Sequence, residues 1–596
     1  MGANLFFAGT GATLEFNGDG DEALLGAWRV RVQRARAHLG WEETGIVARR
    51  HAGGVLLSIA APIDQLFLAT EVNEWALCAA LQERDPALGA GLEAGLLAAA
   101  LENTPGGAAA ADPAAIDAPV LEEAAAFARF ARLAAREARP ALRALLGEAE
   151  ARDLPYLLDE KLLTLGAGSG GRSFALEDLP ASNAVPWAEL HDVPTAIVTG
   201  SNGKTTTVRL LAACAREQGW RAAYNCTDGV FVGTELLASG DYSGPAGARR
   251  VLRDLRTGAA ILEVARGGIM RRGVAVTRSR VALITNISAD HFGEYGIDDL
   301  DGLADAKLTV TAALPDDGLL VLNADDPTLC AKAEGLARRF GRVPALAWFA
   351  LDFDGALLRA QRARGGPSCG VRAGHLRLSG GAGDGAAPGG EHDLGPVSAM
   401  PLTIEGEATY NIANLAGAAL AAAALGVAPS AIARVYARFG AEPADNPGRM
   451  MRFNSRGVRV LVDYAHNPDG LRGFLKVAAT MRSPQGRLGL VLGHAGNRTD
   501  EDVRALARVA ADFRPELIVI KEDEAHLRGR PIGDVPLIIR TELLRLGLPE
   551  SALPMRASEL DAAQYALDWA RPGDVLALPI HAASARAAVL KLLAQG

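Results

Sequence analysis

The chain has 596 residues, a formal net charge of -9 and five scattered cysteines. This length exceeds what one hydrophobic core usually supports, so several domains are expected. The acidic balance argues against a general nucleic-acid binder, because neutralising phosphates requires a basic surface. The cysteine spacing argues against a disulfide framework or a zinc site. There is no recognisable signal peptide or membrane-length apolar run, so we expect a cytoplasmic protein without a membrane or nucleic-acid partner.

The first 190 residues divide into two regions of different character. Residues 1–110 contain strand-like runs at 54–59 and 65–70 and a helical pattern near 71–84, which predict an α+β domain,. Residues 111–190 are rich in alanine and carry apolar positions at helical spacing. We interpret this second region as mainly helical, closing in a glycine-rich stretch.

From residue 191 to 400, nearly continuous apolar strands alternate with helical patterns. The expected strands are 196–199, 260–264, 281–287 and 319–323, with the first helix at 204–217. Strands that are apolar on both faces and alternate with helices indicate a parallel sheet covered on both sides. The glycine-rich segment 365–395 is interpreted as loops around a small hairpin.

A second alternation runs from residue 401 to 596. The expected strands are 458–464, 488–492, 517–521 and 575–579, and the expected helices are 412–425, 430–439, 471–481, 501–513 and 584–593. This pattern predicts a Rossmann-like C-terminal domain. The predicted fold class is therefore α/β and multidomain, with a central P-loop domain built on a parallel sheet and an additional α+β N-terminal region.

The strongest chemical signal is the run TGSNGKTTT at residues 199–207. It follows an apolar strand and begins a helix. Its backbone N–H groups and the positive end of the helix dipole therefore point to the same place, where an anion can bind. Gly200 and Gly203 permit the tight turn, Lys204 can reach β- and γ-phosphates, and the hydroxyl of Thr205 can ligate Mg²⁺. The alternative is a structural strand-to-helix turn with an exposed lysine. The expected ATP-binding residues of this loop are Gly200, Ser201, Asn202, Gly203, Lys204, Thr205 and Thr206.

The loop resembles the TGTNGKTTT loop of the Mur ligase superfamily, and the resemblance extends from about residue 190 to the end. Further matching runs are EVARGGI at 263–269, TNISADH at 285–291, NADDP at 323–327, NIAN at 411–414 and DYAHNP at 463–468. Other runs are similar to the C-terminal part of cyanophycin synthetases: TDG at 227–229, ARGGIMRRG at 265–273 and KEDE at 521–524.

The resemblance implies an ATP-dependent amide ligase, which activates a carboxylate as an acyl phosphate and couples it to an amine. The implied catalytic residues are Lys204, Glu263, His291, Lys307 and Arg449, and the implied metal ligands are Thr205, Glu263 and His291. One or two Mg²⁺ ions are expected, and Lys307 is a candidate for carbamylation. Asn414 is expected near the adenine, Arg449 at the γ-phosphate, and Asp463 at the ribose or the hinge between domains.

Substrate residues are less well defined. His466 and Asn467 share one turn with Asp463. The acidic run Glu522, Asp523 and Glu524 follows a predicted strand, where it would hold a cationic amine such as arginine or lysine. The alternative for such a run is a solvated loop. The expected partners are a small-molecule amine and a carboxylate or peptide, with a basic amino acid joined to an aspartyl side chain as one candidate reaction.

The chain also departs from the cyanophycin-synthetase pattern. Residues 151–174 resemble the start of an ATP-grasp domain, yet the phosphate loop follows almost at once and leaves no room for the rest. Asn497, Thr499 and Tyr410 replace residues that are usual in the family. Two alternatives therefore stay open: a Mur-type ligase for another carboxylate, and a non-catalytic nucleotide-binding subunit of an ATP-grasp partner enzyme. A homo-oligomer is also left open.

Overall fold

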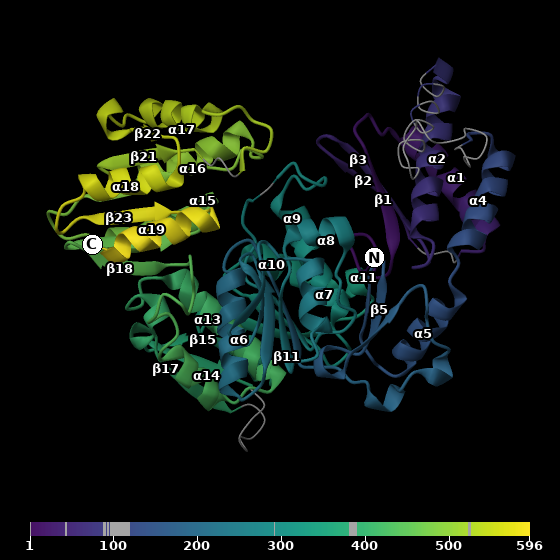
Figure 1. The fold of residues 1–596 in the computed structure, drawn as a ribbon, viewed down its shortest axis with the longest axis horizontal. Coiled ribbons are helices and arrows are strands. Elements are labelled where there is room, and N and C mark those ends of the chain that lie inside the picture. The colour runs from purple at the N-terminus through teal and green to yellow at the C-terminus, as the bar shows by residue number, and fades with distance from the viewer. Residues whose placement is uncertain are drawn as a thin grey trace.

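The chain folds into three lobes, with the N-terminal and C-terminal lobes on either side of the upper part of a central lobe (Figure 1). This computed structural model describes residues 2–41, 45–87, 91, 95, 120–290, 292–380, 390–522 and 526–595. Among these residues, no helix combines the length and apolar character needed to cross a membrane.

In the described residues of the N-terminal lobe, a three-stranded antiparallel sheet in the order β1-β3-β2 packs against helices. Its elements are β1 (Gly11–Phe16), α1 (Glu22–Leu39), β2 (Ile46–His51), β3 (Gly54–Ala60), α2 (Leu66–Arg84) and α4 (Glu123–Glu137). The predicted strand at 65–70 is wrong, because α2 begins at Leu66. Leu68, Val72 and Trp75 recur at helical spacing and are buried in the core of this lobe. A short apolar run at the start of a helix cannot be told from a strand by periodicity alone.

A small antiparallel sheet connects this lobe to the central one. It follows α5 (Pro140–Ala151) and consists of β4 (Tyr156–Leu158), β5 (Leu162–Leu165) and β6 (Arg172–Ala175). Arg253 of the central lobe donates from Nε to Thr164 Oγ1 at 2.9 Å and also forms an ion pair with Asp159. The segment that resembles the start of an ATP-grasp domain thus packs directly on the central lobe.

The central lobe contains an eleven-stranded sheet in the order β10-β9-β8-β11-β7-β12-β13-β14-β15-β16-β17. Its strands are β7 (Thr195–Thr199), β8 (Ala222–Cys226), β9 (Gly229–Val232), β10 (Glu235–Ser239), β11 (Ala259–Glu263), β12 (Val281–Ile284), β13 (Leu319–Asn323), β14 (Ala345–Asp352), β15 (Ser368–Arg372), β16 (His375–Ser379) and β17 (Glu391–Pro396). The strands from β8 to β15 pair in parallel, and antiparallel strands close both edges. The predicted parallel sheet is confirmed.

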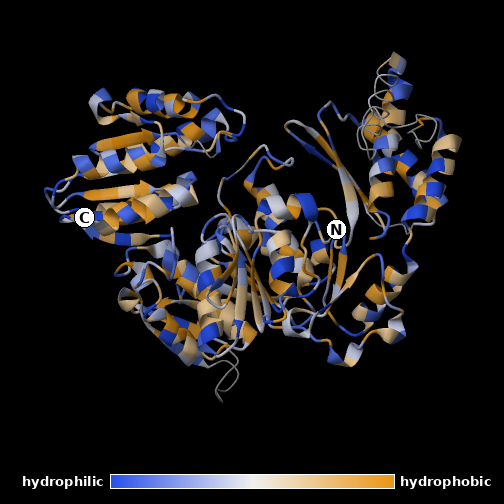
Figure 2. Cartoon of the chain, viewed as in Figure 1, coloured by the Kyte–Doolittle hydropathy of each residue, from blue (hydrophilic) through white to orange (hydrophobic). Residues whose placement is uncertain are grey.

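Helices cover both faces of this sheet, and apolar residues concentrate where helices and strands meet (Figure 2). One face carries α6 (Lys204–Glu217), α13 (Thr409–Leu425) and α14 (Pro429–Tyr436). The other carries α7 (Pro245–Arg253), α8 (Arg266–Arg272), α9 (Leu300–Leu308), α10 (Pro327–Ala333), α11 (Leu336–Phe340) and α12 (Ala356–Ala363). Because α13 and α14 belong to the central core, we propose that the C-terminal lobe starts near residue 450 instead of 401.

The C-terminal lobe has a six-stranded sheet in the order β18-β19-β23-β20-β21-β22, which is parallel except for β18. Its strands are β18 (Met451–Ser455), β19 (Val458–Asp463), β20 (Leu488–Leu492), β21 (Leu517–Lys521), β22 (Met555–Arg556) and β23 (Val575–Pro579). Its helices are α15 (Pro468–Thr480), α16 (Asp500–Asp512), α17 (Asp534–Arg545), α18 (Glu559–Trp569) and α19 (Ala583–Gln595). This is the arrangement that the Rossmann-like pattern predicted.

Replacing Phe349 by alanine should destabilise the central lobe. Phe349 on β14 is buried at 1% exposure, and a Cβ on Gly417 of α13 would lie only 3.1 Å from its ring. The lost packing should cost about 3–5 kcal/mol in urea unfolding followed by tryptophan fluorescence. Leu351→Ala, at a 39% exposed position of the same strand, is the control and should change stability by less than about 1 kcal/mol. Equal unfolding midpoints for the two variants would contradict this account of how α13 is held.

Candidate active site

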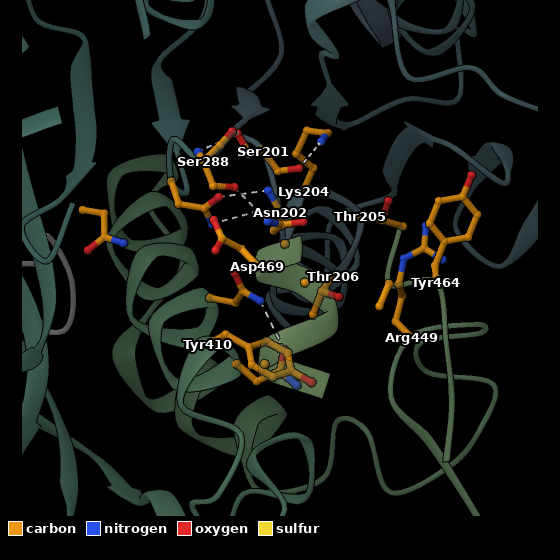
Figure 3. A pocket seen from close by; sticks show the side chains of 18 of the residues that line it. Ser201, Asn202, Lys204, Thr205, Thr206, Ser288, Tyr410, Arg449, Tyr464 and Asp469 are labelled. Carbon is orange, nitrogen blue, oxygen red and sulfur yellow. Dashed lines mark hydrogen bonds between the residues drawn. The ribbon is translucent and has the colours of Figure 1, made fainter. Parts of the chain in front are cut away.

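A cavity of about 470 Å³ lies between the central and C-terminal lobes. It lies at the sheet edge where the neighbouring strands β11, β7 and β12 end. Figure 3 shows side chains that line it. In an open parallel sheet, this edge is the usual place for a ligand. The predicted site residues that line the cavity are Ser201, Asn202, Gly203, Lys204, Thr205, Thr206, Glu263, Asn414, Arg449, Asp463 and His466.

The loop between β7 and α6 is tightly held on both sides. Gly200 has φ +145°, and a Cβ there would lie 1.8 Å from Thr285 Oγ1. Gly203 has φ +84°, and a Cβ there would lie 2.2 Å from Asn414 Oδ1. The Asn202 backbone N–H donates to Asn286 Oδ1 at 2.9 Å. Both glycines are therefore required by backbone conformation and by close neighbours.

Two lysines meet at this loop. Lys204 Nζ folds back and donates to the carbonyls of Gly200 and Ser201, each at 3.0 Å. Lys307 on α9 is buried and donates from Nζ to the same Gly200 carbonyl at 2.9 Å. Burial, together with the nearby charge of Lys204, lowers the pKa of Lys307 well below its ordinary value, although Asp290 opposes the shift. The cavity thus has Lys204 in its wall, and Lys307 supports the loop from behind.

Glu263 at the end of β11 is fully buried. Its Oε2 accepts from Thr205 Oγ1 at 2.8 Å, and its Oε1 accepts from Thr227 Oγ1 at 3.2 Å. Burial raises the pKa of Glu263, and the charge of Lys204 opposes that rise. A buried carboxylate beside two hydroxyl oxygens is a donor set that fits Mg²⁺, a cation that prefers oxygen ligands.

The remaining predicted metal ligand, His291, lies outside the described residues. Among the residues that are described, no group of three or more His, Cys, Asp or Glu side chains could hold a metal. Among the described residues, the oxygens of Thr205 and Glu263 are the groups that could hold Mg²⁺ beside the phosphates,, and the role of His291 stays a prediction.

Helix α13 and the chain that follows α14 form the wall beside the loop. Asn414 Nδ2 donates to Asn411 Oδ1 at 3.2 Å, and both side chains are buried. Asn446 Nδ2 donates to Thr206 Oγ1 at 3.2 Å. Tyr410, which differs from the usual family residue, also lines the cavity. Amide groups are thus concentrated where we expect the nucleoside.

Arg449 brings a positive charge from the other side of the cavity. Its guanidinium lies 4.3 Å from the centre of the Tyr464 ring, and Figure 3 shows the two side chains together. Asp463 supports this turn, because its carboxylate accepts from the backbone N–H of Met450 at 2.6 Å and of Ala465 at 2.8 Å. Burial raises the pKa of Asp463, and Arg449 opposes the rise. In this structure Asp463 therefore organises the backbone that carries Arg449.

The predicted substrate residues differ in their surroundings. His466 faces Asp290 at 3.7 Å. Asn467 Nδ2 donates to Asn202 Oδ1 at 2.9 Å and so joins the two lobes. Glu522 is buried at 5% exposure, and its Oε2 accepts from the Gly533 backbone N–H at 2.6 Å. Asp523 and Glu524 lie outside the described residues. Glu522 is not among the cavity-lining residues.

Two polar residues at or near the site were not assigned a role from the sequence. Thr227 contacts Glu263, and it directly follows β8, the strand next to β11; this position could have predicted the contact. Arg498 forms an ion pair with Asp290 at 3.0 Å across the two lobes. Nothing in the local sequence indicates that pairing, because the partners come from different lobes.

The geometry defines a nucleotide-binding α/β protein whose site is shared by two lobes. Residues 198–343 match the Mur ligase middle domain, and residues 448–578 match the Mur ligase, glutamate ligase domain. The chain is 31% identical over 407 residues to the UDP-N-acetylmuramoyl-L-alanyl-D-glutamate--2,6-diaminopimelate ligase of Alkalilimnicola ehrlichii, covering 64% of this chain and 69% of that one. The chain belongs to the Mur ligase family.

Cyanophycin synthetases are also similar. That of Trichormus variabilis is 34% identical over 400 residues, which are 67% of this chain and 42% of the relative. The chain thus spans about two fifths of the length of this relative. Among solved structures, E. coli FolC in complex with ADP superposes with a TM-score of 0.46 at 18% identity, covering 67% of this chain and 89% of that one.

Replacing Gly203 by alanine should weaken nucleotide binding. The new Cβ would lie 2.2 Å from Asn414 Oδ1, so the loop would have to shift. This comes in addition to the about 1–2 kcal/mol that alanine costs in the left-handed conformation of this position. Gly219→Ala is a matched control, because Gly219 also has a positive φ, +90°, but a Cβ added there would have no atom within 4 Å. Titration with a fluorescent ADP analogue should show at least about a tenfold loss for the Gly203 variant. Equal affinities for the two variants would show that the loop does not hold the nucleotide.

Replacing Glu263 by glutamine should remove the Mg²⁺ dependence of ATP binding. The substitution keeps the shape of the side chain but removes the charge that would compensate a cation. Calorimetry with and without Mg²⁺ should show the metal-dependent gain in affinity reduced by at least about tenfold. Glu235→Gln, on the edge strand β10, should behave as the wild type. The assignment of this metal site is wrong if the Glu263 variant keeps the full Mg²⁺ effect.

Proposed function

We propose that the chain is an ATP-dependent amide ligase that couples a carboxylate to an amine through an acyl phosphate. The observation that supports this most directly is the single cavity lined by Lys204, Thr205 and Glu263 from one lobe and by Arg449 from the other. A phosphate loop alone would serve many nucleotide-dependent reactions. Here the other lobe faces the phosphate loop with Arg449. The space between them provides a place for the γ-phosphate and an acyl acceptor.

The reaction needs activation because oxide is a very poor leaving group from a carboxylate. A carboxylate oxygen attacks the γ-phosphorus, the bond from that phosphorus to the bridging oxygen breaks, and ADP leaves. The amine nitrogen then attacks the carbonyl carbon, the bond to the phosphate oxygen breaks, and inorganic phosphate leaves. The amine gives up a proton to a base or to solvent. ATP is converted to ADP and phosphate, and one amide bond forms.

The residues of the chain contribute binding and electrostatics to these steps. The loop N–H groups and Lys204 hold the phosphates, and Arg449 neutralises charge on the γ-phosphoryl group. Mg²⁺ held by Thr205 and Glu263 would supply further charge neutralisation on the phosphates. Contacts between lobes, such as Asn467 with Asn202, close the cavity and exclude water, which would otherwise hydrolyse the acyl phosphate.

Carbamylation of Lys307 is part of this proposal. The neutral form of an amine reacts with CO₂, and the lowered pKa of buried Lys307 favours that form,. Its Nζ lies 2.9 Å from the Gly200 carbonyl, directly behind the phosphate loop. The modification would convert this amine into a negatively charged carbamate directly behind the phosphate loop.

For the substrates, we propose a basic amino acid as the amine and an aspartyl side chain as the carboxylate. The similarity to cyanophycin synthetases supports this choice. Glu522, one of the three carboxylates expected to hold the amine, is buried and accepts from the Gly533 backbone N–H, and its role in binding the amine stays a prediction. The similarity to diaminopimelate ligases favours a second candidate, a ligase for a glutamyl peptide of the kind named for those relatives.

The proposal is tested by ADP release in the presence of paired amines and carboxylates. Arginine and lysine should be screened with aspartyl peptides, and diaminopimelate with glutamyl peptides. The active pair should give amine-dependent ADP release and an amide product identified by mass spectrometry. Lys204→Ala should reduce turnover by at least about a hundredfold, because it removes a fixed charge on the transferred group. Lys476→Ala, at an exposed position on α15, should behave as the wild type, and identical rates for the two variants would refute the proposal.

A further inference from the structure

Asp228 lies just after β8, at the same sheet edge as the cavity, and holds two arginines. Its Oδ2 accepts from Arg209 Nη2 at 2.6 Å, and its Oδ1 accepts from Arg586 Nη2 at 2.5 Å. The side chains of Arg209, Arg586 and Asp228 are exposed by only 5%, 9% and 18%. Burial raises the pKa of Asp228, but the charges of Arg449, Arg209 and Arg586 together lower it below its ordinary value. The carboxylate therefore sits among three positive charges.

The two arginines come from different lobes. Arg209 belongs to α6, the helix that begins at the phosphate loop, and Arg586 belongs to α19 of the C-terminal lobe. Nη1 of Arg586 is buried without a hydrogen-bond partner among the described residues, so its bond to Asp228 is the main polar anchor of that guanidinium. Asp228 thus ties the C-terminal lobe to the nucleotide-binding helix.

Both arginines also contact the turn that carries Arg449. Arg209 Nη1 donates to Asn446 Oδ1 at 3.1 Å and to the Pro447 carbonyl at 2.9 Å. At Gly448, which has φ +71°, a Cβ would lie 2.8 Å from Arg586, so the backbone of the turn packs directly on that guanidinium. The Arg449 backbone N–H donates to the Asn446 carbonyl at 3.1 Å. The turn of residues 446–449 therefore packs against the guanidiniums of Arg209 and Arg586, and the Asp228 carboxylate holds both of them.

Building on the proposed ligase function, we propose that Asp228 is a positioning residue that sets the place of Arg449 relative to the phosphate loop. It acts through Arg209 on the central lobe and Arg586 on the C-terminal lobe, and it touches no reacting atom. Without its charge, three guanidiniums would share one poorly solvated region and repel one another. The turn would then move away from the phosphate loop, while the loop itself and its bound nucleotide would stay in place.

The neighbour of Asp228 strengthens this role. Thr227 donates to Glu263 Oε1 at 3.2 Å. The adjacent residues Thr227 and Asp228 therefore contact the carboxylate expected to bind the metal and the two arginines, respectively. A purely structural ion pair would stabilise the fold without linking these two parts of the site. The Arg487–Asp574 pair of the C-terminal lobe, at 2.6 Å, is such a structural pair and provides the control.

The experiment measures the separation of the lobes and the affinity for ADP in the full chain. Spin labels at Leu255→Cys and Leu537→Cys, which are 64% and 57% exposed, report on the central and C-terminal lobes. Cys330→Ser removes the partly buried native thiol, and the other four cysteines are buried. The variants Asp228→Asn, Arg586→Met and their combination are compared with Asp574→Asn, and circular dichroism verifies folding of each variant.

We expect a single narrow distance distribution for the wild type with Mg²⁺ and ADP. Asp228→Asn and Arg586→Met should each broaden or shift it, and their combination should do no more than either alone. ADP affinity should change by less than about threefold, whereas kcat with an active substrate pair should fall by about 10–100-fold, because catalysis is sensitive to small displacements of a positioned group. Asp574→Asn should leave the distance, the ADP affinity and kcat unchanged.

The inference is overturned if Asp228→Asn keeps the wild-type distance distribution, or if Asp574→Asn changes it equally. It is also overturned if the Asp228 variant loses ADP binding and kcat in parallel, because that would indicate general damage to the site. Failure of the wild type to bind ADP would instead refute the proposed function. In that case, the distances between the spin labels measured without nucleotide would still test the role of Asp228.

Discussion

The parallel pairing of β7 with β11 and β12 is the constraint on which the site depends. Because parallel strands end at one edge of a sheet, this pairing brings the phosphate loop, Glu263 and Thr285 together although they are far apart in the sequence. The hydrogen bond from Thr205 to Glu263 connects the first two directly. The strands are buried on both faces, so their order and register cannot change without exposing the core of the central lobe.

The second requirement is a partner lobe at that edge. The C-terminal lobe supplies Arg449, and it is joined to the central lobe by polar contacts: Asn467 with Asn202, Arg498 with Asp290, and Arg586 with Asp228. Such contacts are directional, and they add to the apolar packing of Ile404, Ala408 and Tyr410 against the core of the C-terminal lobe. A site divided in this way can open for substrates and close around the proposed acyl phosphate, which water must not reach.

Much of the fold could be predicted from the sequence, because buried parallel strands and the phosphate loop carry strong local signals. The pattern placed α6 at its observed bounds, whereas the first turn of α2 was mistaken for a strand, since a short apolar run is ambiguous,. Thr205, Glu263 and Arg449 were predicted to share a site, and the structure brings them to one cavity. The pairing of Asp228 with Arg586 and of Asp290 with Arg498 could not be predicted, because it depends on how the lobes dock. Glu522 was interpreted from its charge alone, and only the packing shows that it supports the loop before α17.

We expect ATP to bind between the lobes, with its phosphates between Lys204 and Arg449. The most direct measurement is a crystal structure of the chain with Mg²⁺ and a non-hydrolysable ATP analogue. Our account predicts the triphosphate along residues 200–205, the metal beside the oxygens of Thr205 and Glu263, and the Arg449 guanidinium on the γ-phosphate. A nucleotide bound outside this cavity, or one bound at the loop with Arg449 still stacked on Tyr464 and away from the phosphates, would contradict it.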